Sequence, residues 1–379
     1  MKDHFWSGRP CPDWYRQAGL GIFIHWGIFS VPAFAPRGRA IHDLLREDYD
    51  ELNKHLPYAE WYENANRLEA SPTREHHRRT YGDAPYSAFR EPFDEAACRF
   101  DAAAWADSFK AYGARYVVFV TKHHDGYCLW PTGVPNPWRP GWHTERDFVG
   151  ELANAVRARG MRFGLYYSGG LDWTARPLPI ANLGDMFAAV PTEPDYVAYC
   201  LAQVRELIDL YRPSVLWNDI AWPSGATLPG LFDHYYSVVP DGVVNDRWLA
   251  QEGLFNSLRD EANRASFNAM MKARIQAANG PQQTPPPPHC DFRTVEYGMS
   301  AIPADSMWEA CRGLSLAFGY NAQERPEDFL DGQQLIDLYK GVRANGGNLL
   351  INVGPRADAS IPDAQDRPLR ALGAMMQSA

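Results

Sequence analysis

The chain has 379 residues, of which 45% are hydrophobic and 22% are charged, and its formal net charge is -9 at pH 7. This balance is typical of a globular protein, and the length suffices for one large barrel with insertions. The acidic balance and the lack of a lysine- or arginine-rich run argue against a nucleic acid or an anionic membrane as partner.

The sequence also limits the compartment and the redox chemistry. No apolar stretch reaches the roughly 18 residues that a membrane-spanning helix needs, so we expect no membrane partner. The first residues lack an apolar h-region, which predicts a cytoplasmic protein as sequenced, or a periplasmic or secreted one if a signal was removed. The scattered cysteines form no metal-like pairs, and we expect reduced thiols.

Eight short apolar runs predict strands. Four are clear, at residues 21–26, 116–122, 162–168 and 214–219, and four are weaker, at residues 242–247, 292–297, 314–320 and 348–354. Helical patterns stand between them, at residues 101–113, 145–160, 193–211 and 331–347. This alternation predicts parallel β-α-β units in an α/β protein. With no glycine-rich phosphate loop after the first strand, a TIM-like (β/α)8 barrel is favoured over a doubly wound sheet.

Two long segments interrupt the alternation. Residues 28–92 follow the first strand, and residues 248–289 form an inserted segment that ends in the proline run 285–288. The prolines predict a stiff extended piece, and the residues before them a helix or a mobile lid. We therefore expect one catalytic domain over residues 1–379, a barrel with long βα loop insertions.

Polar residues stand at the ends of the predicted strands. The side chains at these ends are His25, Trp26, Lys122, His123, His124, Asp125, Tyr166, Ser168, Asn218, Asp219, Asp246, Arg247, Glu296 and Tyr297. Each one alone has an ordinary structural explanation, such as a turn or a buried histidine. In a barrel, however, the carboxyl ends of the strands share one mouth where catalysis takes place, so their common position indicates a site.

Two chemistries fit this ring of residues. Metal-assisted hydrolysis would use His25, His123, His124 and Asp219 as ligands, although no HxH or HExxH spacing is present. Glycoside hydrolysis needs a carboxyl pair, for which Asp219 and Glu296 are the natural candidates. Tryptophans stack on the apolar faces of sugar rings, which gives a role to Trp26, Trp61, Trp217 and Trp222.

An ordered set of motifs then resembles the α-L-fucosidases of glycoside hydrolase family 29. The motifs are GIFIHWG, AEWY, VFVTKHHDGYCLW, GLYYSGGLDW, VLWND, VVNDRW, FRTVEY, WEACRGLSLAFGYN and GGNLLINVGPRADASIP. They cover nearly the whole chain in order. The resemblance implies a (β/α)8-like domain that releases L-fucose from a fucosylated oligosaccharide or glycoconjugate by a retaining double displacement, without cofactor or metal.

The resemblance also implies roles for individual residues. Asp219 of the W-x-D motif matches the nucleophile, and Glu296 in a T-x-E-Y context matches the acid/base, with Asp291 or Glu252 as the fallback. The matched sugar-binding positions, with Trp217 added as a stacking residue, are His25, Glu60, Trp61, His123, His124, Tyr166, Trp217, Arg247 and Phe318. Tyr166 is preferred to Tyr167 because strand alternation places it with Ser168.

Two features depart from the family pattern. The segment between Arg247 and Glu296 is unusually long, which would cap the aglycone side or displace Glu296. We expect no C-terminal β-sandwich domain, and a homo-oligomer contact would cover any flank that such a domain protects. The alternatives to the fucosidase are a metal-dependent hydrolase on the barrel and a catalytically weak fucose-binding protein.

Overall fold

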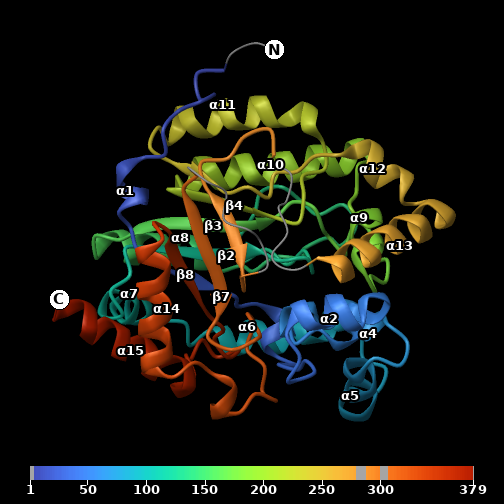
Figure 1. The fold of residues 1–379 in the computed structure, drawn as a ribbon, viewed down its shortest axis with the longest axis horizontal. Helices are drawn as coiled ribbons and strands as arrows, with labels where there is room; N and C mark the ends of the chain where they lie inside the picture. Colours follow the sequence, from blue (N-terminus) through green and yellow to red (C-terminus); the bar gives the residue numbers. More distant parts are fainter. Residues whose placement is uncertain (1–3, 279–286, 299–305, 379) are drawn as a thin grey trace.

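An eight-stranded parallel sheet forms the centre of the molecule (Figure 1). The computed structural model describes residues 4–278, 287–298 and 306–378. The strands are β1 (Leu20–Ile24), β2 (Tyr116–Lys122), β3 (Arg162–Ser168), β4 (Val215–Asp219), β5 (Val243–Val244), β6 (Arg293–Glu296), β7 (Trp308–Gly313) and β8 (Asn348–Val353). Their order is β5-β4-β3-β2-β1-β8-β7-β6, which is the order of neighbours that the predicted barrel requires.

The ladder stops short of closure between β5 and β6 in the described part of the chain. Single hydrogen bonds span this seam instead. Asp291 donates its backbone N–H to the carbonyl of Val244 (2.9 Å), and the Asp291 carboxylate accepts from Val244 N (2.8 Å). Asp246 accepts from the backbone N–H of Thr294 (3.1 Å). The fold is thus a TIM-like barrel with one polar seam.

Helices surround the sheet and fill its loops (Figure 1). They are α1 (Asp13–Arg16), α2 (Ile41–Glu47), α3 (Leu52–His55), α4 (Tyr62–Arg67), α5 (Pro72–Tyr81), α6 (Arg90–Ala97), α7 (Ala102–Ala111), α8 (Phe148–Ala158), α9 (Leu183–Ala188), α10 (Pro194–Tyr211), α11 (Leu228–Val238), α12 (Glu252–Ser257), α13 (Glu261–Ala277), α14 (Gly332–Ala344) and α15 (Asp363–Gln377). The four predicted helices are confirmed as α7, α8, α10 and α14. Among them, α7 begins at the N-cap Asp101, which accepts from Ala104 N, as its sequence predicts.

One predicted strand is wrong. Residues 314–320 form no strand, and β7 lies just before them, at Trp308–Gly313. The charged Glu309 and Arg312 conceal this strand in the sequence, because Glu309 is buried inside the barrel where an apolar residue is usual. The apolar run 314–320 is instead the loop after β7, which carries Phe318 to the mouth of the barrel.

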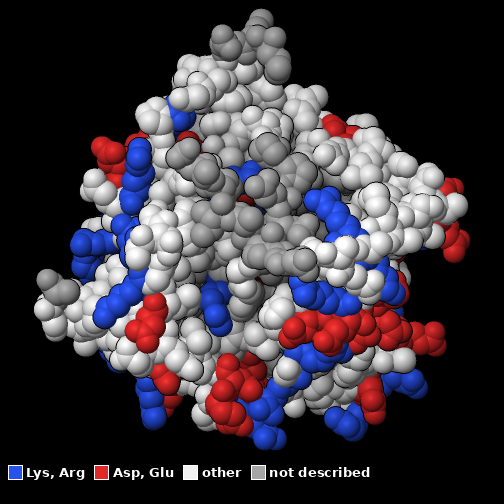
Figure 2. Space-filling view, in the orientation of Figure 1, with Lys and Arg blue, Asp and Glu red and all other residues white. Residues whose placement is uncertain are grey.

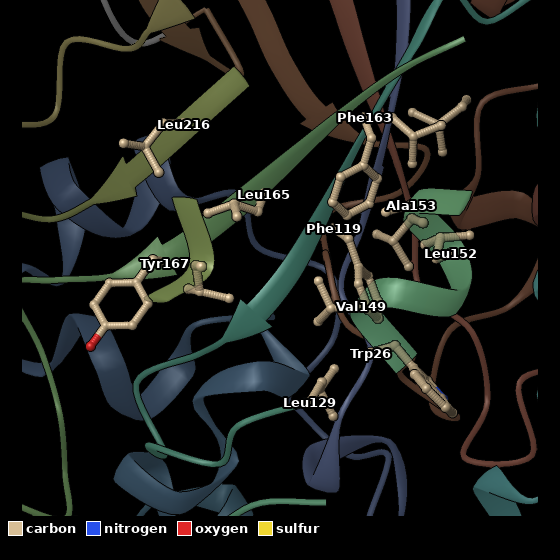
Figure 3. Close-up of a cluster of buried hydrophobic side chains, with 14 of the residues drawn as sticks. Trp26, Phe119, Leu129, Val149, Leu152, Ala153, Phe163, Leu165, Tyr167 and Leu216 are labelled. Atoms are coloured by element: carbon tan, nitrogen blue, oxygen red, sulfur yellow. The ribbon is translucent and has the colours of Figure 1, made fainter. Parts of the chain in front are cut away.

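Alternation along the strands separates two hydrophobic layers. On β3, Phe163, Leu165 and Tyr167 face the helices, where Figure 3 shows them with Leu216 of β4. Tyr166 faces the barrel interior. This pattern of period two places every second side chain of a strand toward the shared mouth.

The two predicted insertions carry helices, and residues of the first one, such as Leu45 and Trp61, line the mouth of the barrel. Residues 28–92 hold α2 to α5 and the start of α6, and residues 248–278 hold α12 and α13, which confirms the helix expected there. Pro285 and Pro286 of the proline run lie outside the described residues. Acidic and basic side chains are interspersed over the helices around α2 and α5 in Figure 2. Within the described ranges, no helix has both the length and the apolar character needed to cross a bilayer.

Candidate active site

A cavity of about 230 Å³ opens at the carboxyl ends of the strands. The two carboxylates and the nine sugar-binding positions assigned through the family motifs all line it: His25, Glu60, Trp61, His123, His124, Tyr166, Trp217, Asp219, Arg247, Glu296 and Phe318. They come from five strand ends and three loops, so the fold brings together residues that lie up to almost 300 positions apart in the sequence.

Four side chains suggested for the site do not line the cavity. Trp26 packs among Phe93 and Phe100 outside the sheet, and Trp222 packs against Trp248. The two fallback carboxylates are also used elsewhere: Asp291 lies in the β5–β6 seam, and Glu252 accepts from Gly225 N (2.7 Å). The cavity therefore leaves Asp219 and Glu296 as the carboxyl pair nearest to Arg247.

A single guanidinium joins the two carboxylates. Arg247, which follows β5, donates from Nη1 to Oδ1 of Asp219 (2.9 Å) and from Nη2 to Oε2 of Glu296 (2.7 Å). Asp219 is the last residue of β4 and Glu296 the last residue of β6. One planar cation thus fixes the spacing of two carboxylates from different strands, a geometry that a lysine would not reproduce.

Asp219 is held as a carboxylate. Burial alone raises the pKa of this group, but the charge of Arg247 and the hydrogen bond from Tyr166 outweigh it and hold the pKa below its ordinary value. The Tyr166 hydroxyl donates to Oδ2 (2.8 Å), and the backbone N–H of Ile220 donates to Oδ1 (2.8 Å). Asp219 is therefore charged and oriented at neutral pH, as a nucleophile requires.

The backbone turns sharply after each carboxylate. Ile220 has φ 66° and Tyr297 has φ 47°, both in the left-handed region that non-glycine residues rarely adopt. A β-branched residue there is a marked outlier, and such strain persists only where the surroundings enforce it. The turns end β4 and β6 at the carboxylates, so these side chains lie at the mouth.

Glu60 differs from the other two carboxyl groups. Only 2% of it is exposed, and burial raises its pKa to about 8, although its Oε2 accepts from the backbone N–H of Gly319 (2.7 Å). Glu60 is therefore protonated at neutral pH. It supplies a donor as well as an acceptor to the wall of the cavity.

The histidines of the wall are neutral. Burial lowers the pKa of His25 and of His124 to about 4 and that of His123 well below its ordinary value. His123 Nδ1 has no hydrogen-bond partner among the described residues. Neutral rings in a cavity both donate and accept, which suits the hydroxyl groups of a sugar.

The hydrogen-bond network assigns the tautomer of His25. Asn352 on β8 donates from Nδ2 to the carbonyl of Phe318 (2.6 Å), so its Oδ1 faces Nδ1 of His25 at 2.6 Å. The His25 proton is then on Nδ1, and Nε2 is an acceptor.

His124 follows the same rule. The Ser168 hydroxyl donates to the carbonyl of Leu171 (2.6 Å) and so accepts from Nδ1 of His124 (2.6 Å). Nε2 of His124 is then a hydrogen-bond acceptor 3.8 Å from Oδ2 of Asp219. A ligand hydroxyl that donates to either acceptor satisfies it.

Aromatic rings complete the wall. Tyr166 stacks on Trp217 with ring centres 5.6 Å apart and planes at 22°. Phe318 lies 5.3 Å from Tyr58, and the Tyr58 hydroxyl donates to Oε1 of Glu296 (3.0 Å). These rings form an apolar patch beside the carboxylates, suited to a methyl group or the C–H face of a sugar.

The sequence reasoning missed three residues of this network. Tyr58 directly precedes the AEWY motif, and Asn352 is a polar residue that follows three apolar residues of β8. Glu309 is the third: it is 0% exposed and accepts from Trp217 Nε1 (3.2 Å) and Tyr15 (2.7 Å). A polar residue inside a buried strand is the signal that could have found the last two.

The metal alternative finds little support in the arrangement of the ligands. Across residues 4–278, 287–298 and 306–378, no group of three or more His, Cys, Asp and Glu side chains is placed to hold a metal ion. His25 and His124 direct Nδ1 into the protein, to Asn352 and Ser168. A chelator test remains the direct check.

The chain is similar to known fucosidases along its length. A sequence profile described as Alpha-L-fucosidase matches residues 3–379. Alpha-L-fucosidase of Dictyostelium discoideum is 31% identical over 94% of this chain and 68% of that protein. Human tissue alpha-L-fucosidase is 29% identical over 97% of this chain and 68% of its own length.

Solved structures give the same result. The crystal structure of Thermotoga maritima alpha-fucosidase in complex with fucose is 40% identical, with a TM-score of 0.78, over 97% of this chain and 74% of that one. The same protein in complex with a mechanism-based inhibitor gives a TM-score of 0.77 over the same shares. A Thermotoga maritima alpha-L-fucosynthase in complex with alpha-L-Fuc-(1-2)-beta-L-Fuc-N3 is 41% identical, with a TM-score of 0.80, over 97% of this chain and 74% of that one.

Proposed function

This chain belongs to the alpha-L-fucosidase family of glycoside hydrolases, and we propose that Asp219 and Glu296 carry out its retaining reaction. Asp219 attacks the anomeric carbon of a terminal α-L-fucosyl group while Glu296 acts as the general acid and gives a proton to the leaving oxygen. The product of this step is a β-linked fucosyl ester on Asp219. Glu296 then takes a proton from water, which attacks the anomeric carbon. The bond from that carbon to Asp219 breaks, the carboxylate is regenerated, and L-fucose leaves with its α configuration.

Arg247 supports both steps because it contacts both carboxylates. In the first step Asp219 loses its negative charge on forming the ester, and Glu296 gains one on giving up its proton. The guanidinium bonds Asp219 at 2.9 Å and Glu296 at 2.7 Å, so it stabilises the charge on either side without moving. A fixed cation of this kind lowers the barrier because it needs no reorganisation as the charge transfers.

The neutral wall supports binding of the sugar. Nε2 of His25 and of His124 accept from ring hydroxyls, and protonated Glu60 and the indole of Trp61 supply donors. The aromatic patch around Phe318 receives the C5 methyl group. A polar substituent at that carbon would lose its hydrogen bonds on entering the patch, which would disfavour L-galactose.

The observation that carries the proposal is the Arg247 bridge between two carboxylates in a cavity lined by neutral histidines. The substrate it supports is the terminal α-L-fucose of a fucosylated oligosaccharide or glycoconjugate. The Thermotoga maritima alpha-L-fucosynthase was solved in complex with alpha-L-Fuc-(1-2)-beta-L-Fuc-N3, so a fucosyl saccharide binds to this fold in that protein.

The test is hydrolysis of 4-nitrophenyl α-L-fucoside by wild type, Asp219→Gly and Glu296→Ala, each with and without azide. We expect Asp219→Gly to be inactive until azide restores turnover and yields the β-fucosyl azide. Glu296→Ala should give the α-fucosyl azide, because azide then attacks the anomeric carbon of the β-linked ester and displaces Asp219. If azide rescues neither variant, the assignment of Asp219 and Glu296 is overturned. Loss of wild-type activity in EDTA would favour the metal-dependent alternative.

A further inference from the structure

The cavity of the carboxylates extends into an apolar wall that the sugar-binding residues do not account for. We propose that this wall is a subsite for the aglycone, built for leaving groups that present an apolar surface; the inference rests on the proposed function. The residues of the wall are Ile41, Leu45, Leu52, Leu56, Leu183, Met186 and Ile220, and they line the same cavity as Asp219 and Glu296.

The wall lies on the outer side of the carboxylates. The histidines are buried at strand ends, whereas Leu45 of α2 and Met186 of α9 belong to helices of the βα loops and are half-buried. Leu56 precedes Tyr58, which donates to Glu296. A fucosyl group held by the histidines therefore directs its leaving oxygen past Glu296 and toward these helices.

The wall has few polar partners to offer. Asn53 and Asn182 are the uncharged polar side chains beside it in the cavity, and Asn53 is bound to the backbone at Ile180 O (3.1 Å). A leaving group rich in hydroxyls would lose water there without regaining hydrogen bonds, while an apolar group gains by burial. The wall therefore discriminates by apolar surface rather than by hydroxyl pattern.

Helix α13 of the 248–289 segment holds the two sides of the wall together, and Figure 1 shows it beside α9 and α2. Asn268 Oδ1 accepts both from the Tyr49 hydroxyl (3.1 Å), which follows α2, and from Gly184 N (2.9 Å) of α9. Lys272 pairs with Asp50 (2.5 Å).

No residue of α13 is buried, so this helix adds little to the core. Besides the contact of the Phe267 ring with Phe187 of α9, it forms the polar contacts with α9 and with residues that follow α2 described above. We infer that α13 fixes the width of the aglycone subsite.

The experiment measures the binding of methyl, propyl and hexyl 1-thio-α-L-fucosides by calorimetry. In these ligands sulfur replaces the glycosidic oxygen, so they resist hydrolysis. In wild type Kd should fall as the chain lengthens, by up to about fourfold per buried methylene. Met186→Gln should reduce the ratio of hexyl to methyl affinity (1/Kd) by roughly three- to tenfold, because a polar group replaces an apolar one of similar length. Asn268→Ala should reduce the same ratio of affinities, because α9 and the residues that follow α2 then lose their shared hydrogen-bond acceptor.

Met270→Gln is the matched control, since Met270 is exposed on α13 and does not line the cavity. It should keep the wild-type dependence on chain length. A Kd that is independent of chain length, with methyl thiofucoside still bound, would overturn the subsite and leave the fucosidase function standing. Failure of every thiofucoside to bind, together with no hydrolysis of 4-nitrophenyl α-L-fucoside, would overturn both.

Discussion

Nδ1 of His25 lies 2.6 Å from Oδ1 of Asn352, and this contact fixes which nitrogen of the ring faces the cavity. Because Asn352 donates to Phe318 O (2.6 Å), its amide cannot be reversed without placing two acceptors face to face. The ring thus presents Nε2 as an acceptor.

The tautomer can be measured and altered. In wild type with ¹⁵N-labelled histidine, we expect His25 at neutral pH to carry its proton on Nδ1, seen in the ring nitrogen shifts. Asn352→Asp should raise the pKa of His25 above about 4, because a carboxylate stabilises the imidazolium. Below that raised pKa His25 is protonated and the acceptor at Nε2 is lost, so KM for 4-nitrophenyl α-L-fucoside should rise by about tenfold in Asn352→Asp at a pH where wild-type His25 is still neutral.

The matched control for this prediction is Asn345→Asp at the C-cap of α14. It changes the same amide to a carboxylate away from the cavity and should leave KM unchanged. An Nε2–H tautomer in wild type would contradict the hydrogen-bond network.

Removing Arg247 should change the pH dependence of catalysis. Burial raises the pKa of Asp219, and Arg247 is the largest of the influences that lower it. In Arg247→Met the hydrogen bonds from Tyr166 and Ile220 still oppose burial but the largest opposing influence is gone, so the pKa of Asp219 rises and the acid limb of kcat/KM moves to higher pH. We also expect kcat/KM to fall by about 100-fold or more, because a buried carboxylate loses its partner.

The pH profile of kcat/KM is the measurement, and Arg205→Met on the exposed side of α10 is the control. A variant with lower activity and an unmoved acid limb would show that Arg247 acts by position alone.

Glu60 should make stability depend on pH. Its pKa is about 8 in the native state and 4.5 as the ordinary value, so the native state keeps a proton that the unfolded state loses. Stability therefore falls as pH rises between these values, by about 1.4 kcal/mol per pH unit at most. Glu60→Gln, which stays neutral, should lack this loss, and its free energy of unfolding should exceed that of wild type increasingly up to about pH 8.

Denaturant unfolding of both proteins between pH 5 and about pH 8 checks this prediction. Glu261→Gln on the exposed start of α13 is the matched control. A difference between wild type and Glu60→Gln that stays constant with pH would mean that Glu60 is ionised in the native state.

Much of the candidate site was predictable because its polar side chains directly follow apolar strands, at positions where the chain stops pairing. The positions of Asp219, Arg247 and Glu296 in the site could therefore be predicted from the sequence. This signal failed for β7, since a strand with buried Glu309 does not show apolar alternation. It also failed for Tyr58, which lies in a loop.

Other features could not come from one sequence. The tautomers of His25 and His124 depend on partners from β8 and β3 that pair across the fold. The open seam between β5 and β6 depends on side chains of Asp246 and Asp291 that read as ordinary turn residues. The hydrogen bonds of Asn268 with Tyr49 and Gly184 join segments that lie far apart in the sequence, and no motif links these segments.

The neighbouring tyrosines of β3 give a matched pair for the last prediction. The Tyr166 hydroxyl donates to Asp219 (2.8 Å) inside the barrel, and the Tyr167 hydroxyl donates to Gln203 (2.9 Å) on the outer side. Tyr166→Phe removes a hydrogen bond to the proposed nucleophile and should lower kcat/KM by about tenfold or more. Tyr167→Phe removes a structural hydrogen bond and should cost about 1 kcal/mol of stability with kcat/KM unchanged.

Steady-state kinetics and denaturant unfolding on both variants separate the two effects. If Tyr167→Phe were the variant with reduced kcat/KM, the alternation of β3 would be displaced by one residue, and every side chain of the strand would exchange faces. The opposite result ties catalysis to the inner face of the barrel, because the two substitutions are chemically identical and differ only in the side of the sheet on which they lie.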